Sequence, residues 1–138
     1  ISEYAPSNNR SQLLKKSSNT IILDAYNANP SSMKEAIENL ESIPSENKMV
    51  ILGQMNEMGA YSQQEHENLG KLIASKNIQT AVLYGEEMQY ALPYLPKAYY
   101  FTDKFSLHNW LQDSKPQNQL ILIKGSRGAK METVLDFL

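Results

Sequence analysis

The feature that most constrains the fold of this chain is the alternation of short apolar runs with longer segments of helical period along its 138 residues. This pattern is typical of an α/β domain whose sheet is mostly parallel. The apolar runs predict six strands, over residues 12–15, 20–24, 48–52, 80–84, 98–101 and 119–124.

The link between the first two predicted strands, residues 16–19, is too short for a crossover helix, so these strands should form an antiparallel hairpin. The later gaps are long enough for helices, which favours parallel pairing. We therefore predict a Rossmann-like, three-layer α/β domain. Its six-stranded sheet should be mostly parallel, with one antiparallel strand and helices on both faces.

Two capping boxes predict helix starts, Ser32 with Glu35 and Ser62 with Glu65. Pro44 should end the first of these helices. Three further helices are expected: one over 86–92 that stops at Pro93, one that begins from an N-cap at Thr102 or Asp103, and one over 128–138.

Composition narrows the class of protein. The absence of cysteine excludes disulfide scaffolds, cysteine-based metal sites and thiol nucleophiles. A net charge of −2 gives no basic field for nucleic acid, and no apolar run is long enough to span a membrane. The length suits one compact, monomeric domain over 1–138. The start at Ile1 without Met indicates a fragment of a longer chain, with residues 1–10 as a connector.

Ligands of open α/β sheets gather at the carboxyl ends of the strands. The second predicted strand ends in Asp24-Ala-Tyr-Asn-Ala-Asn, just before a helix. Asp24 can accept two ribose hydroxyls, while Asn27 and Asn29 can pair with a base edge or a peptide. The alternative interpretation is a polar turn that only caps the helix.

The third strand leads into residues 53–59, where two glycines would let the backbone approach a ligand closely. His66 lies one turn into the next helix, but a lone histidine is more often structural. We assign no catalytic residue in this chain. His66 and His108 are not spaced as metal ligands, so no metal site is predicted either.

The last strand ends in Lys124-Gly-Ser-Arg-Gly-Ala-Lys. Backbone N–H groups at the start of the following helix would favour an anion, and Arg127 can grip a carboxylate with two hydrogen bonds. The alternative is that these cations only decorate a loop. The segment lacks the spacing of a P-loop, and the chain has neither a G-x-G-x-x-G nor a G-x-S-x-G motif.

Taken together, the three strand ends resemble the C-terminal domain of the Mur ligases. The resemblance rests on residues 24–33, on 53–59 followed by Ser62 and His66, and on 122–127 with Met131-Glu132. It extends from about Asn9 onward. The branch of the family that adds a D-alanyl-D-alanine dipeptide usually has Asp where Gln54 stands, and Leu where Asn56 and Met58 stand.

The resemblance implies a three-domain, cytoplasmic enzyme of peptidoglycan biosynthesis that uses ATP. Its substrates would be UDP-N-acetylmuramoyl-tripeptide and D-Ala-D-Ala. ATP would convert the tripeptide carboxylate into an acyl phosphate, which the dipeptide amine attacks. The P-loop and the Mg²⁺ ligands would belong to a central domain, so this chain alone should be inactive.

The resemblance also implies site residues. Those on the ATP side would be Arg10, Asp24, Asn27 and Asn29, and those that bind D-Ala-D-Ala would be Lys124, Ser126 and Arg127. The alternative is a stand-alone nucleotide-binding or receiver-like signalling module. A receiver needs acidic residues beside Asp24, whereas Gly53 and Gln54 follow the third strand.

Overall fold

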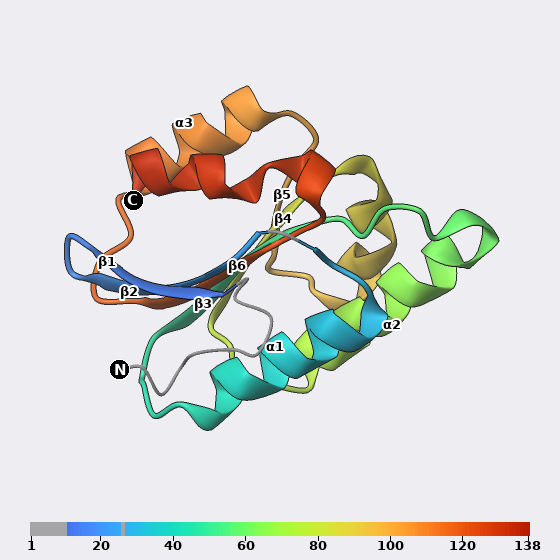
Figure 1. Ribbon diagram of the computed structural model, residues 1–138, viewed down its shortest axis with the longest axis horizontal. Helices are drawn as coiled ribbons and strands as arrows, with labels where there is room; N and C mark the ends of the chain where they lie inside the picture. Colours follow the sequence, from blue (N-terminus) through green and yellow to red (C-terminus); the bar gives the residue numbers. More distant parts are fainter. Residues whose placement is uncertain (1–10, 26) are drawn as a thin grey trace.

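The computed structural model describes residues 11–25 and 27–138. Its centre is a six-stranded sheet in the order β1-β2-β6-β3-β4-β5 (Figure 1). The strands are β1 (Gln12–Lys16), β2 (Asn19–Asp24), β3 (Lys48–Gly53), β4 (Thr80–Tyr84), β5 (Tyr99–Phe101) and β6 (Leu120–Lys124). The predicted strands are therefore all present, with ends that differ by a residue at most.

Strands β1 and β2 pair antiparallel, with Lys16 opposite Asn19, and every other pairing in the sheet is parallel. Ser17 adopts a left-handed φ of 55° in the tight turn between the first two strands. The prediction of a mostly parallel sheet with one antiparallel hairpin is confirmed.

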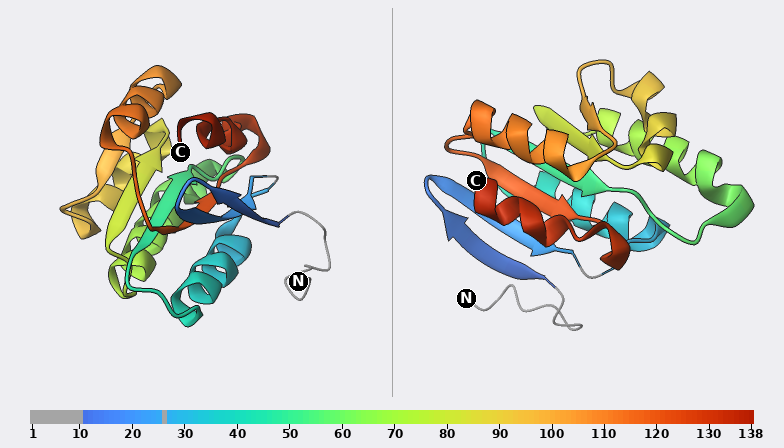
Figure 2. Two further views of the ribbon diagram at one scale, coloured as in Figure 1. Left: turned by 90° about the vertical axis from the view of Figure 1, so that its left-hand side faces the viewer. Right: turned by 90° about the horizontal axis from the view of Figure 1, so that it is seen from above.

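Helices cover both faces of the sheet, as Figures 1 and 2 show. On one face lie α1 (Pro30–Ser42) and α2 (Ser62–Ala74), and on the other lie α3 (Lys104–Ser114) and the 3-10 segment η5 (Met131–Phe137). Successive side chains of a strand point to opposite faces. Accordingly, Leu122 joins the core under α1 and α2, whereas Ile121 and Ile123 join the core under α3 and η5.

Two predicted N-caps, Ser32 and Ser62, are wrong. The N-cap of α1 is Asn29, which exchanges hydrogen bonds with Ser32 in a capping box, so Ser32 is the third helical residue rather than the cap. Pro30 at the first helical position fits this start, since that position needs no N–H donor. Ser62 is the first residue of α2, after the short η2 segment (Gly59–Tyr61), and its hydroxyl donates to Glu87 instead of capping the helix.

Two predicted helices are 3-10 segments. Residues Glu86–Tyr94 form η3, which continues through Pro93. The predicted helix over 128–138 is split into η4 (Arg127–Ala129) and η5 because Lys130 between them has a left-handed φ of 49°. The expected helix N-terminus after β6 is therefore absent, and helix-dipole binding of an anion there does not apply. The predicted cap of α3 at Asp103 is confirmed.

Candidate functional site

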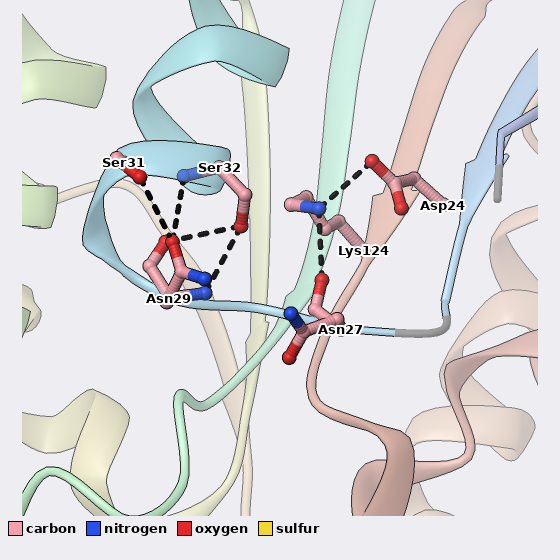
Figure 3. Close-up of polar contacts among 6 residues, drawn as sticks. All are labelled: Asp24, Asn27, Asn29, Ser31, Ser32 and Lys124. Carbon is pink, nitrogen blue, oxygen red and sulfur yellow. Dashed lines mark hydrogen bonds and ion pairs between the residues drawn. The ribbon is translucent and has the colours of Figure 1, made fainter. Parts of the chain in front are cut away.

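The ends of β2 and β6 bring together two predicted half-sites, the polar residues that follow β2 and those that follow β6. Asp24 and Lys124 are paired positions of these parallel strands, and their side chains form an ion pair of 2.8 Å. Figure 3 shows the Lys124 ammonium between the Asp24 carboxylate and the backbone carbonyl of Asn27, to which it also donates at 2.9 Å. Lys124 thus joins the two half-sites that the sequence suggested separately.

Lys124 is only 1% exposed. A buried ammonium must be paired and hydrogen-bonded, because its transfer out of water is costly. Its bonds therefore fix the Asp24 side chain and the backbone at Asn27. The Asp24 side chain remains 17% exposed. Among the described residues, only its Oδ2 atom accepts a hydrogen bond, from Lys124, so the other carboxylate oxygen can accept one from a ligand.

Asn27 and Asn29 have different local roles. The Asn29 Oδ1 atom accepts from the Ser32 N–H at 2.8 Å and from the Ser31 hydroxyl at 3.1 Å, which stabilises the start of α1. Asn27 is exposed, and Figure 3 shows its side chain directed away from Lys124. The alternative interpretation, a polar turn that only caps the helix, thus holds for the side-chain oxygen of Asn29. Arg10, the remaining ATP-side residue, lies outside the described residues.

The ends of β3 and β6 also meet closely. A Cβ atom on Gly125 would lie 3.1 Å from the Cα of Gly53, so neither strand end has room for a side chain there. The backbone after β3 thus packs closely against the backbone after β6, and its approach to a ligand stays a prediction. Next along the chain, Ser126 is 6% exposed and its hydroxyl oxygen accepts from the Asn56 amide at 2.7 Å. Arg127 follows on the surface, at the start of η4.

His66 fixes the loop after β3 rather than facing a ligand. Its Nε2 accepts from the Met55 N–H at 3.0 Å, and its Nδ1 donates to the Ser62 carbonyl at 2.8 Å. Burial lowers the pKa of His66, against smaller raising effects of the Ser62 hydrogen bond and of Glu87 and Glu65. The neutral imidazole that results is the form that can accept from Met55.

Within the described part of the chain, no three His, Asp or Glu side chains gather as potential metal ligands. The chain as a whole has no cysteine. None of the helices in the described ranges has the length and apolar character needed to cross a bilayer.

The predicted site residues that the structure describes all lie at the carboxyl ends of the parallel strands. Asp24 and Lys124 end adjacent strands, Asn27 and Asn29 follow β2, and Ser126 and Arg127 follow β6. The sequence did not predict a supporting role for Asn56, whose amide donates to Ser126, or for Gln54, whose amide donates to Asn56. Gln54 and Asn56 departed from the family pattern, which was the one available signal.

These features define a Mur ligase C-terminal domain. The family model described as "Mur ligase, glutamate ligase domain" matches residues 9–127, and the chain belongs to this family.

Within the family, the chain is similar to UDP-N-acetylmuramoyl-tripeptide--D-alanyl-D-alanine ligases. It is 34% identical to the one from Rickettsia prowazekii over 140 residues, and 35% identical to the one from Bacillus subtilis over 134 residues. The alignments cover 99% and 91% of this chain but 31% and 29% of those proteins. The chain thus spans less than a third of the length of these relatives.

Solved structures agree with this relationship. MurF from Acinetobacter baumannii superimposes with a TM-score of 0.80 at 32% identity, over 92% of this chain and 29% of that one. MurF from Thermotoga maritima in complex with ADP superimposes with a TM-score of 0.78 at 25% identity, over 93% of this chain and 30% of that one.

Proposed function

We propose that this chain is the C-terminal domain of a cytoplasmic, ATP-dependent ligase of peptidoglycan biosynthesis. The complete enzyme would join D-Ala-D-Ala to UDP-N-acetylmuramoyl-tripeptide. ATP would phosphorylate the terminal carboxylate of the tripeptide and release ADP. The dipeptide amine would then attack the acyl phosphate, form the amide and expel phosphate.

The observation that carries this proposal is the juxtaposition of Asp24 and Lys124 at the ends of β2 and β6. It joins the loop that would meet the nucleotide to the loop that would meet the dipeptide. Family membership and relatives named for this reaction support the same assignment.

We assign the ATP side to Asp24, through its remaining carboxylate oxygen, and to the Asn27 side chain. Arg10 is carried over from the family resemblance, and Asn29 retains only its side-chain NH₂ for this role because its oxygen caps α1. These residues would contact the nucleotide ribose and its surroundings. Mg²⁺ would neutralise phosphate charge while held by the rest of the enzyme.

We assign the dipeptide side to Ser126 and Arg127. The Ser126 hydroxyl and the Arg127 guanidinium are both suited to a carboxylate. Lys124 would contribute indirectly, because its ammonium is bound to the Asp24 carboxylate and to the Asn27 backbone carbonyl. This chain would contribute positioning: held near the acyl phosphate, the amine reacts in an effectively unimolecular step from which water is excluded.

The test is ligation by the full-length protein that carries this chain, with mass spectrometry of the product and measurement of ADP release. Arg127→Ala should raise the KM for D-Ala-D-Ala with less effect on ATP, whereas Asp24→Ala should chiefly weaken ATP binding. Lys97→Ala is the control, because Lys97 lies just before β5 and therefore at the amino ends of the parallel strands, away from the predicted site at their carboxyl ends. The proposal fails if the full-length protein makes no dipeptide adduct, or if this chain alone makes one.

A further inference from the structure

A line of four hydrogen-bonding groups runs from the start of η3 to Ser126. The Glu87 N–H donates to Gln54 Oε1 at 2.8 Å, and Gln54 Nε2 donates to Asn56 Oδ1 at 3.1 Å. Asn56 Nδ2 in turn donates to Ser126 Oγ at 2.7 Å. The line connects three strand ends, those of β4, β3 and β6.

The direction of every bond in this line is fixed by its first member. A backbone N–H can only donate, so Gln54 must present its oxygen to Glu87 and its NH₂ to Asn56. Asn56 must then present its oxygen to Gln54 and its NH₂ to Ser126. A flip of either amide would set two donors against each other at one end of that side chain.

Glycines make room for the two amides. A Cβ atom on Gly85 would lie 2.5 Å from Gln54 Oε1, so the Gln54 amide rests directly on the Gly85 backbone. A Cβ atom on Gly128 would lie 3.3 Å from Asn56 Nδ2, closer than most carbon contacts. Both amides are therefore held between neighbouring segments.

We infer that Gln54 and Asn56 are positioning residues that make the Ser126 hydroxyl a hydrogen-bond donor toward the carboxylate of the incoming dipeptide. The hydroxyl oxygen already accepts from Asn56, so its own proton is directed elsewhere. Among the described residues, none accepts that proton. A donor hydroxyl selects a carboxylate, which only accepts, over a carboxamide that presents its NH₂. This inference rests on the proposed ligase function.

The test compares two substrates in the full-length enzyme, D-Ala-D-Ala and D-alanyl-D-alaninamide, which lacks the carboxylate. Asn56→Leu removes the donor to Ser126 and should lower kcat/KM for D-Ala-D-Ala about tenfold relative to that for the amide. The KM for ATP should not change. A merely structural defect would lower the two kcat/KM values together.

The matched control is Asn68→Leu. Gln64 Nε2 donates to Asn68 Oδ1 at 3.0 Å on the surface of α2, so this pair has the same chemistry but does not contact Ser126. Asn68→Leu should leave the substrate ratio unchanged. In a Ser126→Ala background, Asn56→Leu should have no further effect on the ratio, because both changes remove the same donor.

An unchanged ratio in Asn56→Leu, or effects of Asn56→Leu and Ser126→Ala that add in full, would overturn the inference while leaving the ligase function intact. A wild-type enzyme that ligates neither dipeptide would overturn the ligase function and this inference with it. The two failures are therefore distinguishable.

Discussion

Asp24 and Lys124 are 100 residues apart in the chain, yet their side chains form an ion pair of 2.8 Å between adjacent parallel strands. The two partners differ in exposure, since the Lys124 side chain is 2% exposed and that of Asp24 is 17% exposed. Removal of Asp24 therefore leaves a buried charge without its carboxylate partner, whereas removal of Lys124 leaves a partly exposed one.

Asp24→Ala should lower the free energy of unfolding more than Lys124→Met. The first leaves a buried ammonium with one carbonyl partner, at a cost of about 3 kcal/mol. The second leaves a carboxylate that water can reach, and should cost about 1–2 kcal/mol. Urea unfolding of the chain measures both values.

Glu41→Ala is the control for this pair. It breaks the Lys76–Glu41 ion pair of 3.3 Å, whose side chains are 19% and 37% exposed, and should cost less than about 1 kcal/mol. An equal or reversed order of Asp24→Ala and Lys124→Met would show that burial does not decide the effect.

His66 should make the stability of the domain depend on pH. Burial lowers its pKa below the ordinary value of 6.5, so the unfolded chain binds the proton more tightly than the folded one. The stabilisation is complete above about pH 6.5 and is lost as the pH falls below that value, with a slope of at most about 1.4 kcal/mol per pH unit. Urea unfolding between pH 7.5 and about 5.5 checks this.

His66→Gln should remove most of that slope. His108→Gln is the comparison, because burial and Lys104 also lower the pKa of His108 against a raising effect of Asp136, but its ring is less buried. If the pH slope of the unfolding free energy survives in His66→Gln and disappears in His108→Gln, then His108 rather than His66 causes the pH dependence.

The sheet could be predicted from the sequence because each strand is a short apolar run with a polar segment on either side. The hairpin followed from the short link between β1 and β2. The adjacency of β2 and β6 could not be derived in this way, since both are apolar strands and local pattern does not specify their neighbours. The ion pair of Asp24 with Lys124 depends on that adjacency.

The errors at helix ends have local and distant causes. Asn29 and Ser32 are both good capping residues. Pro30 favours Asn29 as the N-cap, because proline suits the first helical position. Ser62 is drawn away from capping by Glu87, 25 residues later in the chain. The left-handed Lys130 divides the last helix, and Lys104 donates to its carbonyl and to that of Ala129, contacts that no local pattern reveals.

Gly70→Ala should destabilise the domain although alanine is the better helix former. The new Cβ would lie 2.7 Å from the Ala91 carbonyl oxygen and 2.9 Å from its Cα, where α2 packs on η3. The helix gains about 1 kcal/mol from alanine, but overpacking against backbone costs about 1–3 kcal/mol. We expect a net loss of roughly 1 kcal/mol in urea unfolding.

Asn68→Ala, at an exposed position of α2, is the control and should change stability by less than about 0.5 kcal/mol. A stabilised Gly70→Ala variant would mean that η3 can move away from α2 without loss of other contacts.

Lys104→Met should loosen the segment that follows Arg127. The Lys104 ammonium donates to the Ala129 carbonyl, to the Lys130 carbonyl at 3.0 Å and to the Thr133 hydroxyl at 3.3 Å. It also lies 4.9 Å from the centre of the Tyr84 ring. Loss of these bonds should lower the free energy of unfolding by about 1–3 kcal/mol and speed limited proteolysis between Gly125 and Leu138.

Lys71→Met is the matched control, because the Lys71 ammonium lies 5.3 Å from the centre of the Tyr94 ring but donates to no carbonyl of the described residues. That substitution should cost less than about 1 kcal/mol, and cleavage of the C-terminal segment should not accelerate. If the two variants lost equal stability and were cut at equal rates, the ring contact rather than the carbonyl bonds would account for the effect of Lys104. Faster cleavage in Lys104→Met alone would show that α3 holds η4 and η5, and with them Arg127, against the sheet.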